Sequence, residues 1–329
     1  MRRRLLGRSG MRVSELCLGT MTFGTGGRGG GADETACREI YAAYREAGGN
    51  FVDTADIYTA GQSESIVGRL VAGERDSIVL ATKFTLPTDA GDANSGGGHR
   101  KSLRRSVETS LRRLGTDYVD LLWVHAWDQC TPGEETLRAL DDLVRSGKVL
   151  AIGVSNTPAW VVARSQAIAE LRGWSAFCAL QIEYSLVSRS VEREFLPMAQ
   201  ALGLTVTAWS PLARGLLAGK TPPARDTPLA PSRERVANAV AETAKVAAEL
   251  GTTSPSVALA WLLGRGVIPV LGASRQAQIR DNLGAAGLRL DDAQTERLDA
   301  ATRIGLGYPY TLLNERFPML SAAAYAPGR

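Results

Sequence analysis

The sequence predicts a (β/α)8 barrel, in which eight parallel strands close into a cylinder and a helix follows each strand. Eight short β-forming runs alternate with helical segments along the chain. Most of these runs are continuously apolar, as strands covered on both faces are. The length of 329 residues suits eight strand–helix units. The alternative is a doubly wound sheet, which normally carries a glycine fingerprint after its first strand, and that fingerprint is missing.

The predicted strands are short and regularly spaced. They cover residues 14–19, 50–55, 77–83, 118–125, 149–155, 179–185, 204–210 and 267–274. We expect residues 1–13, which precede the first of them, to form a hairpin that closes the bottom of the barrel. Because no low-complexity linker or change in composition interrupts the pattern, we expect residues 1–329 to form one domain.

Helix start and stop signals lie between the predicted strands. Thr131 and Pro132 are typical of a helix N-cap and first residue, and Thr131 with Glu134 fits a capping box. Gly147 is placed to end that helix. The same start signal recurs at Thr157-Pro158 and Ser254-Pro255. Two glycine clusters (24–31 and 95–99) and the Pro-rich segment 221–232 are predicted loops.

Composition indicates a soluble globular protein. Hydrophobic residues make up 44% and charged residues 22% of the chain, and no apolar run approaches the ~20 residues that span a membrane. The basic start "MRRRLLGRSGMR" is not followed by the apolar core of a signal peptide. The four cysteines are dispersed, as free thiols in a reducing compartment are: Cys17, Cys37, Cys130 and Cys178. We therefore expect a cytoplasmic protein with no membrane partner.

The charge pattern does not indicate a nucleic-acid partner. The net charge is +4, and the stretch "RKSLRRSVETSLRRLG" is rich in arginine. Its apolar residues recur at helical spacing, which places the arginines on the solvated face of an amphipathic helix: Leu103, Val107, Leu111 and Leu114. No nucleic-acid-binding motif accompanies the charge.

Two further classes of site are excluded by spacing. The stretch "GLLAGKT" (215–221) resembles a phosphate-binding P-loop, but three residues separate its glycines where that motif needs four. No HExxH or paired-cysteine motif indicates a metal site. We expect neither nucleotide hydrolysis nor a bound metal.

Polar residues end three neighbouring predicted strands. Asp53 ends the second, Lys83 the third and His125 the fourth, and Tyr58 follows Asp53 by five residues. In a (β/α)8 barrel the active site lies at the C-terminal ends of the strands, so these four side chains should converge on one rim. We expect Asp56, between them, only to shape the turn, and His99 to be solvated in its glycine-rich loop.

An acid, a phenol, an amine and an imidazole together suit carbonyl chemistry. A tyrosine with a pKa near ~10 is a poor proton donor at neutral pH, and a buried ammonium beside it should lower that pKa. The aspartate pairs with the ammonium, which is otherwise an isolated buried charge. A neutral histidine can orient a substrate oxygen. The hydride must come from a cofactor, because no side chain supplies one.

Seven motifs resemble those of the aldo-keto reductases, in order, from residue 14 to about 290. They are "NFVDTADIYTAGQSE", "LATKF", "VDLLWVH", "GVSN", "QIEYS", "AWSPLARGLLAGK" and "LGASRQAQIRDN". The resemblance implies reduction of an aldehyde or ketone to the alcohol with NADPH, on a barrel without a separate dinucleotide-binding domain. It assigns Tyr58 as the proton donor and His125 as the residue that orients the carbonyl. It assigns Lys83 and Asp53 as the pair that tunes the tyrosine.

The same resemblance assigns the cofactor contacts. Trp209 matches the aromatic residue that stacks on the nicotinamide, and tryptophan there resembles the branch that contains potassium-channel β-subunits. Arg275 is the expected partner of the 2′-phosphate. The other matching residues are Gly19, Thr20 and Met21 under the nicotinamide, Ser155, Asn156 and Gln181 at its carboxamide, Ser210, Pro211, Leu212, Gly215 and Lys220 at the pyrophosphate, and Gly272, Ser274, Gln278 and Asn282 at the adenosine end.

The sequence leaves several alternatives undecided, both for single residues and for the function. Trp127 could line the substrate pocket, but it and Trp123 could equally serve packing. The chain could instead be a cofactor-binding regulatory subunit with slow turnover, as the channel-subunit resemblance suggests, or a reductase of keto-deoxysugar nucleotides. The residues name no substrate beyond a small carbonyl compound, and a homo-oligomer is compatible with them.

Overall fold

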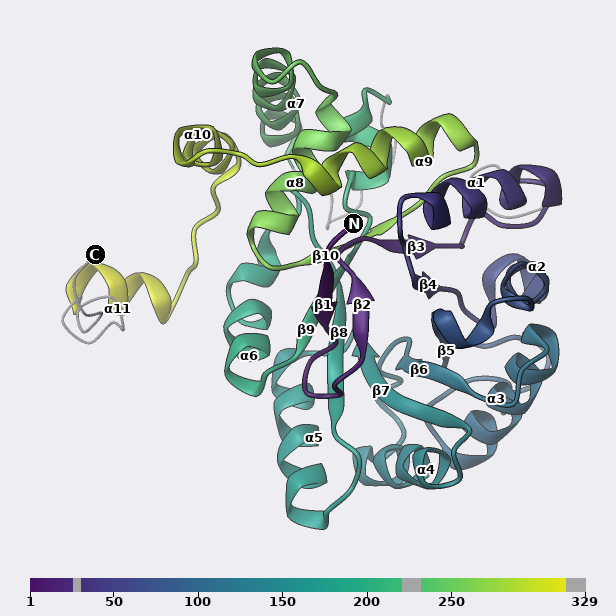
Figure 1. Ribbon diagram of the computed structural model, residues 1–329. Coiled ribbons are helices and arrows are strands. Elements are labelled where there is room, and N and C mark those ends of the chain that lie inside the picture. Colours follow the sequence, from purple (N-terminus) through teal and green to yellow (C-terminus); the bar gives the residue numbers. More distant parts are fainter. Residues whose placement is uncertain (26–30, 221–231, 318–329) are drawn as a thin grey trace.

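Eight parallel strands close into a barrel in the computed structural model of the chain, which describes residues 1–25, 31–220 and 232–317 (Figure 1). Around the barrel the order is β10-β3-β4-β5-β6-β7-β8-β9. The strands are β3 (Cys17–Gly19), β4 (Phe51–Asp53), β5 (Val79–Phe84), β6 (Val119–Val124), β7 (Val149–Ser155), β8 (Phe177–Glu183), β9 (Thr205–Trp209) and β10 (Ile268–Leu271). The predicted (β/α)8 fold is confirmed, and every predicted strand overlaps an observed one.

Helices surround the barrel, and the C-terminal helix α11 stands away from it (Figure 1). The α-helices are α1 (Glu34–Glu46), α2 (Gln62–Val71), α3 (Arg100–Leu114), α4 (Gly133–Arg145), α5 (Ala159–Arg172), α6 (Phe195–Leu202), α7 (Arg233–Glu249), α8 (Ser254–Gly264), α9 (Gln276–Leu283), α10 (Asp292–Thr302) and α11 (Tyr310–Arg316). Short 3-10 helices are η1 (Tyr58–Gly61), η2 (Arg75–Ser77), η3 (Ser190–Glu192), η4 (Ala213–Ala218) and η5 (Gly284–Gly287). Over the described ranges, no helix is both long and apolar enough to cross a membrane.

The N-terminal residues form the predicted hairpin. Strands β1 (Arg3–Leu5) and β2 (Arg12–Ser14) pair antiparallel. Leu6 and Val13 are fully buried and pack in one cluster with Phe51 and Trp123 of the barrel interior. The backbone N–H of Gly7 donates to Thr205 Oγ1 at 2.6 Å, at the start of β9. The hairpin therefore covers the N-terminal end of the barrel, opposite the end where the candidate site lies.

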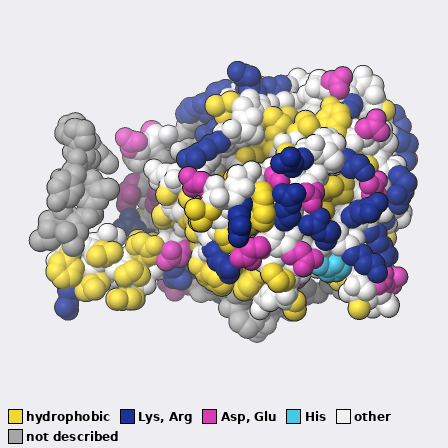
Figure 2. All heavy atoms as spheres, turned by 90° about the horizontal axis from the view of Figure 1, so that it is seen from below, with side chains coloured by type: hydrophobic (Ala, Val, Ile, Leu, Met, Phe, Trp, Pro, Cys, Tyr) yellow, Lys and Arg dark blue, Asp and Glu magenta, His cyan; other side chains and the backbone are white. Residues whose placement is uncertain are grey.

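The amphipathic reading of the arginine-rich segment is confirmed. Helix α3 covers it, and the four apolar residues that define its inner face are all buried. Figure 2, a view from below, shows lysine and arginine side chains interspersed with acidic ones over the outer surface. Most basic residues of α3 are exposed, whereas Arg113 is half-buried and pairs with the buried Glu64.

Helix caps depart from the predictions in detail. Helix α4 begins at Gly133, with Pro132 as its N-cap and no side-chain cap, so the predicted capping box is wrong. The cause is competition, since the Thr131 hydroxyl donates to Asp128 Oδ2 at 2.5 Å and Glu134 pairs with Arg164 at 2.8 Å.

The other start signals were also misplaced by a residue, whereas the stop signal was correct. Helix α5 has Pro158 as its N-cap, and α8 has Thr253. Gly147 follows α4 at φ +74°, as a helix-ending glycine does. His99 is partly exposed, and it is also the N-cap of α3, where its Nδ1 accepts from Ser102 N at 3.3 Å, a role that the sequence did not predict. The loops predicted at 24–31 and 221–232 lie largely outside the described residues.

The turn after β4 contains a buried carboxyl group. Asp56 is 2% exposed, and its Oδ2 accepts from Ser106 Oγ of α3 at 2.6 Å. Burial, opposed mainly by the hydrogen bond from Ser106 and aided by the charge of Glu64, raises the pKa of Asp56 to about 7. Asp56 therefore ties the turn to α3, and it titrates near neutrality.

We predict that Asp56 makes stability depend on pH. Its folded pKa is raised above the unfolded value, so its contribution is present at low pH and is lost as pH rises through about 7. Asp56→Asn keeps an acceptor for Ser106 but does not titrate. Urea unfolding at pH 4.5 and 7.5 should show wild type losing about 2–4 kcal/mol relative to the variant, at ~1.4 kcal/mol per pKa unit. A difference that does not change with pH contradicts this.

Candidate active site

Three of the four predicted catalytic side chains meet at one buried ammonium. Lys83 Nζ donates to Asp53 Oδ2 at 2.5 Å, to Tyr58 OH at 3.0 Å and to the carbonyl oxygen of Thr54 at 2.9 Å. Lys83 is 0% and Asp53 2% exposed. Each proton of the ammonium therefore has an acceptor, as a buried charge requires.

The local topology explains why these groups meet. In the parallel register of β4 and β5, Asp53 lies opposite Ala81, so Lys83 extends two residues beyond the end of β4. Its side chain thus reaches both Asp53 and the backbone of Thr54. After β4 the chain turns into η1, whose first residue is Tyr58, and this turn brings the tyrosine back over the same end of the barrel.

The hydrogen bond from Lys83 leaves the hydroxyl proton of Tyr58 free. Because the tyrosine oxygen accepts from the ammonium, its own hydrogen is available to another acceptor. Burial raises the pKa of Tyr58, and the charge of Lys83 lowers it by less. Lys83 therefore lowers the pKa of Tyr58 as predicted, but burial outweighs this effect, so the net direction is upward and a lowered pKa is not observed.

The charge state of Lys83 is fixed by its neighbours. Burial by itself lowers the pKa of Lys83, but the carboxylate of Asp53 and the phenol of Tyr58 together raise it above its usual value. The side chain is therefore an ammonium at neutral pH. This ion pair is buried on both sides, so removing either partner leaves an uncompensated charge.

His125 lies beside the tyrosine and is uncharged. It directly follows β6, and its ring meets that of Tyr58 edge-on, with centroids 6.0 Å apart. Burial, and then the nearby charge of Lys83, lower the pKa of His125 to about 3. Its Nδ1 is buried and has no hydrogen-bond partner among the described residues. A neutral imidazole in this position can hydrogen-bond a substrate oxygen without competing for the proton.

The predicted carboxamide-binding residues lie at the ends of β7 and β8. Ser155 Oγ and Gln181 Nε2 are buried and make no hydrogen bond of normal geometry in the described chain, although Gln181 lies near Asp53 and lowers the pKa of that carboxyl. Asn156, at φ +44°, donates from Nδ2 to the carbonyl oxygen of His125 at 2.9 Å. Its Oδ1 accepts from Trp209 Nε1 at 3.2 Å. Asn156 thus joins the end of β6 to the end of β9.

The predicted pyrophosphate loop is a tight turn after β9. Ser210 and Arg214 have φ of +50° and +58°, and Gly215 has φ of +96°. The N–H of Lys220 donates to the carbonyl oxygen of Gly215 at 3.0 Å, which closes the turn. The N–H groups of Ala213 and Gly215 also donate to carbonyl oxygens within the turn, so its left-handed backbone is held by internal hydrogen bonds. All five predicted members of this loop lie in it: Ser210, Pro211, Leu212, Gly215 and Lys220.

The predicted adenosine-end residues lie between β10 and α9. Ser274 donates to Gln278 Oε1 from its N–H at 2.9 Å and from its hydroxyl at 3.2 Å. Asn282 is buried and donates to the carbonyl oxygen of Gly272 at 3.5 Å. Arg275 is exposed at the N-cap position of α9. Arg275 is therefore the member of this group whose charge faces solvent.

Of the three residues predicted to lie under the nicotinamide, at the end of β3 and just after it, two are buried and one is exposed. A Cβ added to Gly19 meets Val270 Cγ1 at 2.7 Å, so only glycine fits there without a shift. Thr20 is buried, and its Oγ1 lies 3.1 Å from the carbonyl oxygen of Asp53 and 2.9 Å from Ser63 Oγ. Met21 is 58% exposed. The Thr20 side chain thus holds the end of β4, and Met21 is the one of the three that is open to a ligand.

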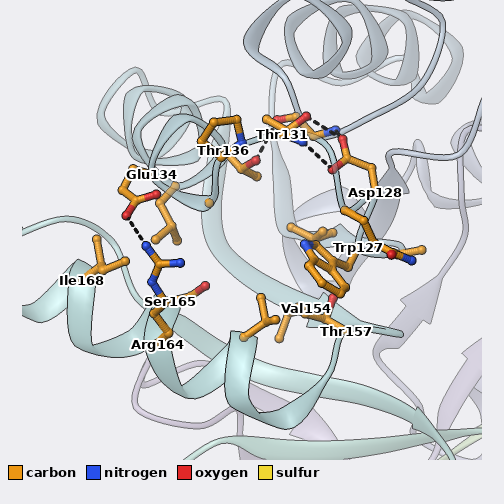
Figure 3. A pocket seen from close by; sticks show the side chains of 18 of the residues that line it. Trp127, Asp128, Thr131, Glu134, Thr136, Val154, Thr157, Arg164, Ser165 and Ile168 are labelled. Carbon is orange, nitrogen blue, oxygen red and sulfur yellow. Dashed lines mark hydrogen bonds and ion pairs between the residues drawn. The ribbon is translucent and has the colours of Figure 1, made fainter.

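Trp127 lines a cavity of about 330 Å³ between α4 and α5 (Figure 3). Its ring packs edge-on against Trp160, with centroids 5.8 Å apart, and the Glu134–Arg164 ion pair lies on the opposite side of the cavity. Neither Tyr58 nor Lys83 lines this cavity. Trp127 therefore lies two residues from His125 along the chain, but none of the four catalytic candidates lines its cavity.

Sequence reasoning missed two kinds of group at this site. The first is the backbone carbonyl of Thr54, which is the third hydrogen-bond acceptor of the Lys83 ammonium. A backbone acceptor cannot be recognised from the type of side chain. The second is the set of side chains behind the tyrosine turn, in which Arg113 donates to Glu64 Oε2 at 3.0 Å. Glu64 is fully buried, although glutamate within an amphipathic pattern normally indicates an exposed position. Across the described ranges no group of side chains is arranged to hold a metal ion.

Known proteins resemble the chain over most of its length. Residues 15–303 match the sequence profile of the Aldo/keto reductase family. A norsolorinic acid reductase of Aspergillus flavus is 38% identical over 93% of this chain and 82% of its own length. An uncharacterized oxidoreductase of Bacillus subtilis is 40% identical over 87% of this chain and 91% of its own. An aryl-alcohol dehydrogenase of Pestalotiopsis microspora is 35% identical over 95% and 85%. The chain belongs to the aldo/keto reductase family.

Proposed function

We propose that this protein reduces an aldehyde or ketone to the alcohol with NADPH, and that Tyr58 supplies the proton. One observation carries the proposal: the Lys83 ammonium holds the phenol oxygen at 3.0 Å and leaves the phenol hydrogen free. The names of the relatives, which are reductases and dehydrogenases, agree with this reaction class. The whole chain, 1–329, acts as one domain in this proposal.

The residues at the barrel mouth fit a nicotinamide cofactor. Ser155 and Gln181 place buried, unpartnered polar atoms at the ends of adjacent strands, which suits a carboxamide. Trp209 places a partly exposed aromatic ring at the end of β9. We assign the turn that contains Gly215 and ends at the cation Lys220 to the pyrophosphate, and the exposed Arg275 to the 2′-phosphate. When bound, NADPH supplies the hydride that no side chain can.

The side chains divide the proton chemistry among them. The carbonyl carbon gains a hydride, and the carbonyl oxygen gains the proton of Tyr58, which becomes a phenolate. Lys83 stabilises that phenolate through the hydrogen bond already present, and Asp53 keeps the ammonium paired. Neutral His125 donates a hydrogen bond that orients the carbonyl. Positioned proton transfer of this kind contributes about 10²–10⁴ in rate.

The names of the relatives suggest a first class of substrate to assay. A relative 35% identical to this chain is named for aryl alcohols. We therefore propose aryl aldehydes as the first compounds to assay, with keto-deoxysugar nucleotides as the alternative.

We predict that Tyr58→Phe lowers kcat by about 10²–10⁴, because the phenol proton is lost while the ring remains. NADPH affinity should stay within about twofold, since no predicted cofactor contact changes. NADPH oxidation at 340 nm, with an aryl aldehyde as the first substrate, measures kcat. Turnover close to that of wild type excludes Tyr58 as the donor.

We also predict that Arg275 distinguishes the two dinucleotides. Arg275→Ala should weaken NADPH binding by about tenfold and leave NADH binding unchanged, because only NADPH carries the 2′-phosphate. Arg280→Ala is the matched control, since Arg280 is another exposed arginine of α9 and pairs with Glu46. Quenching of tryptophan fluorescence on titration, with Trp209 as the expected reporter, gives both affinities. Equal losses for both dinucleotides contradict the assignment.

A further inference from the structure

The turn that carries Tyr58 has an unusual backbone conformation. Thr59 and Ala60 have φ of +46° and +55°, and Gly61 follows at φ +89°. Residues with a Cβ rarely adopt the left-handed region, and two in succession persist only where the surroundings hold them. The position of the tyrosine therefore depends on contacts made by the rest of the turn.

Arg113 of α3 makes such contacts on both sides of the turn. Its Nη1 donates to the carbonyl oxygen of Asp56 at 2.9 Å and to Glu64 Oε2 at 3.0 Å. A Cβ added to Gly61 lies only 2.2 Å from Arg113 Cζ, so the guanidinium packs directly against that glycine. One side chain thus holds the backbone before Tyr58, the backbone after it and the first turn of α2.

Glu64, the partner of Arg113, also contacts β5, the strand that contains Lys83. Glu64 is 0% exposed, and its Oε1 accepts from Thr82 Oγ1 at 2.7 Å. Thr82 directly precedes Lys83 in β5. The chain of contacts therefore runs from the turn through Arg113 and Glu64 to the residue beside the ammonium.

We propose that Arg113 is a positioning residue for the proton donor, fixing the turn so that the phenol stays in hydrogen-bond range of Lys83. This inference rests on the proposed role of Tyr58. Arg113 does not touch the phenol, so it acts through the backbone of Asp56 and through Glu64. A displacement of about 1 Å at a reacting group can cost on the order of 10² in rate.

The test compares Arg113→Met with a control that loses a similar buried arginine. Arg75→Met is that control, because Arg75 pairs with Asp120 at 2.7 Å and donates to the carbonyl oxygens of Ile78 and Tyr118, near the start of β5 and far from the site. At a temperature where both variants are folded, Arg113→Met should lower kcat by about 10- to 100-fold with NADPH affinity unchanged. Arg75→Met should change kcat by less than twofold. Equal effects of the two variants on kcat overturn the proposal.

A double variant separates positioning from a general loss of activity. If Arg113 acts only through the tyrosine, Tyr58→Phe combined with Arg113→Met should be no slower than Tyr58→Phe alone. Independent, multiplying losses overturn the proposal. Retained turnover in Tyr58→Phe alone shows instead that the proposed function has failed, which keeps the two failures distinct.

Arg113→Lys decides the matter if the methionine variant does not fold. Lysine keeps a positive charge beside Glu64 but is a point charge without the planar fork of arginine. We expect the variant to fold and to lose at least about threefold in kcat, because one ammonium does not reproduce the contacts with both Asp56 and Gly61. An unchanged kcat in folded Arg113→Lys overturns the proposal.

Discussion

The buried ammonium of Lys83 is the constraint around which the site is arranged. An ammonium removed from water is stabilised only if its protons meet acceptors and its charge meets an opposite charge. Asp53 supplies the charge, and Thr54 and Tyr58 supply the other two oxygens. Because these three acceptors come from the end of β4 and the turn after it, the ammonium also fixes where that turn begins.

The barrel explains how residues far apart in sequence form the site around Lys83. Neighbouring parallel strands end at the same edge, so side chains far apart in sequence meet there. The N-terminal hairpin covers the opposite end, with Leu6 and Val13 buried against the barrel interior. Burial then sets the electrostatics at the open end, where it keeps His125 neutral and raises the pKa of Tyr58. The same burial makes the position of each charge critical.

Sequence reasoning located the strands from periodicity, and it placed Asp53, Lys83 and His125 on one rim because each ends a strand. Apolar runs mark buried strands, and the residues that end them share one rim. It did not predict the start of α4, because the Thr131 hydroxyl donates to Asp128, three residues earlier, and is not available as a helix cap. Nor could it predict that Asn156 bridges His125 and Trp209, because such a contact depends on three strand ends at once.

It also misjudged the balance of effects on Tyr58. The sequence motifs predicted that Tyr58 lies near Lys83. The free-energy cost of burying a phenolate, however, depends on the packing around the tyrosine, which the sequence does not show. The Arg113 contact was missed for a related reason. An arginine in an amphipathic helix indicates solvent, and only the fold shows that Gly61 and the buried Glu64 lie against it.

Replacing the ammonium tests the central claim most directly. Lys83→Met keeps an unbranched side chain of similar length and removes the charge that holds Tyr58 and pairs with Asp53. Single-turnover oxidation of bound NADPH by a carbonyl substrate measures the chemical step alone. The account predicts a rate lower by at least about 100-fold, with NADPH affinity within about threefold of wild type. A rate within a factor of about two contradicts it, because the phenol then transfers its proton without the ammonium.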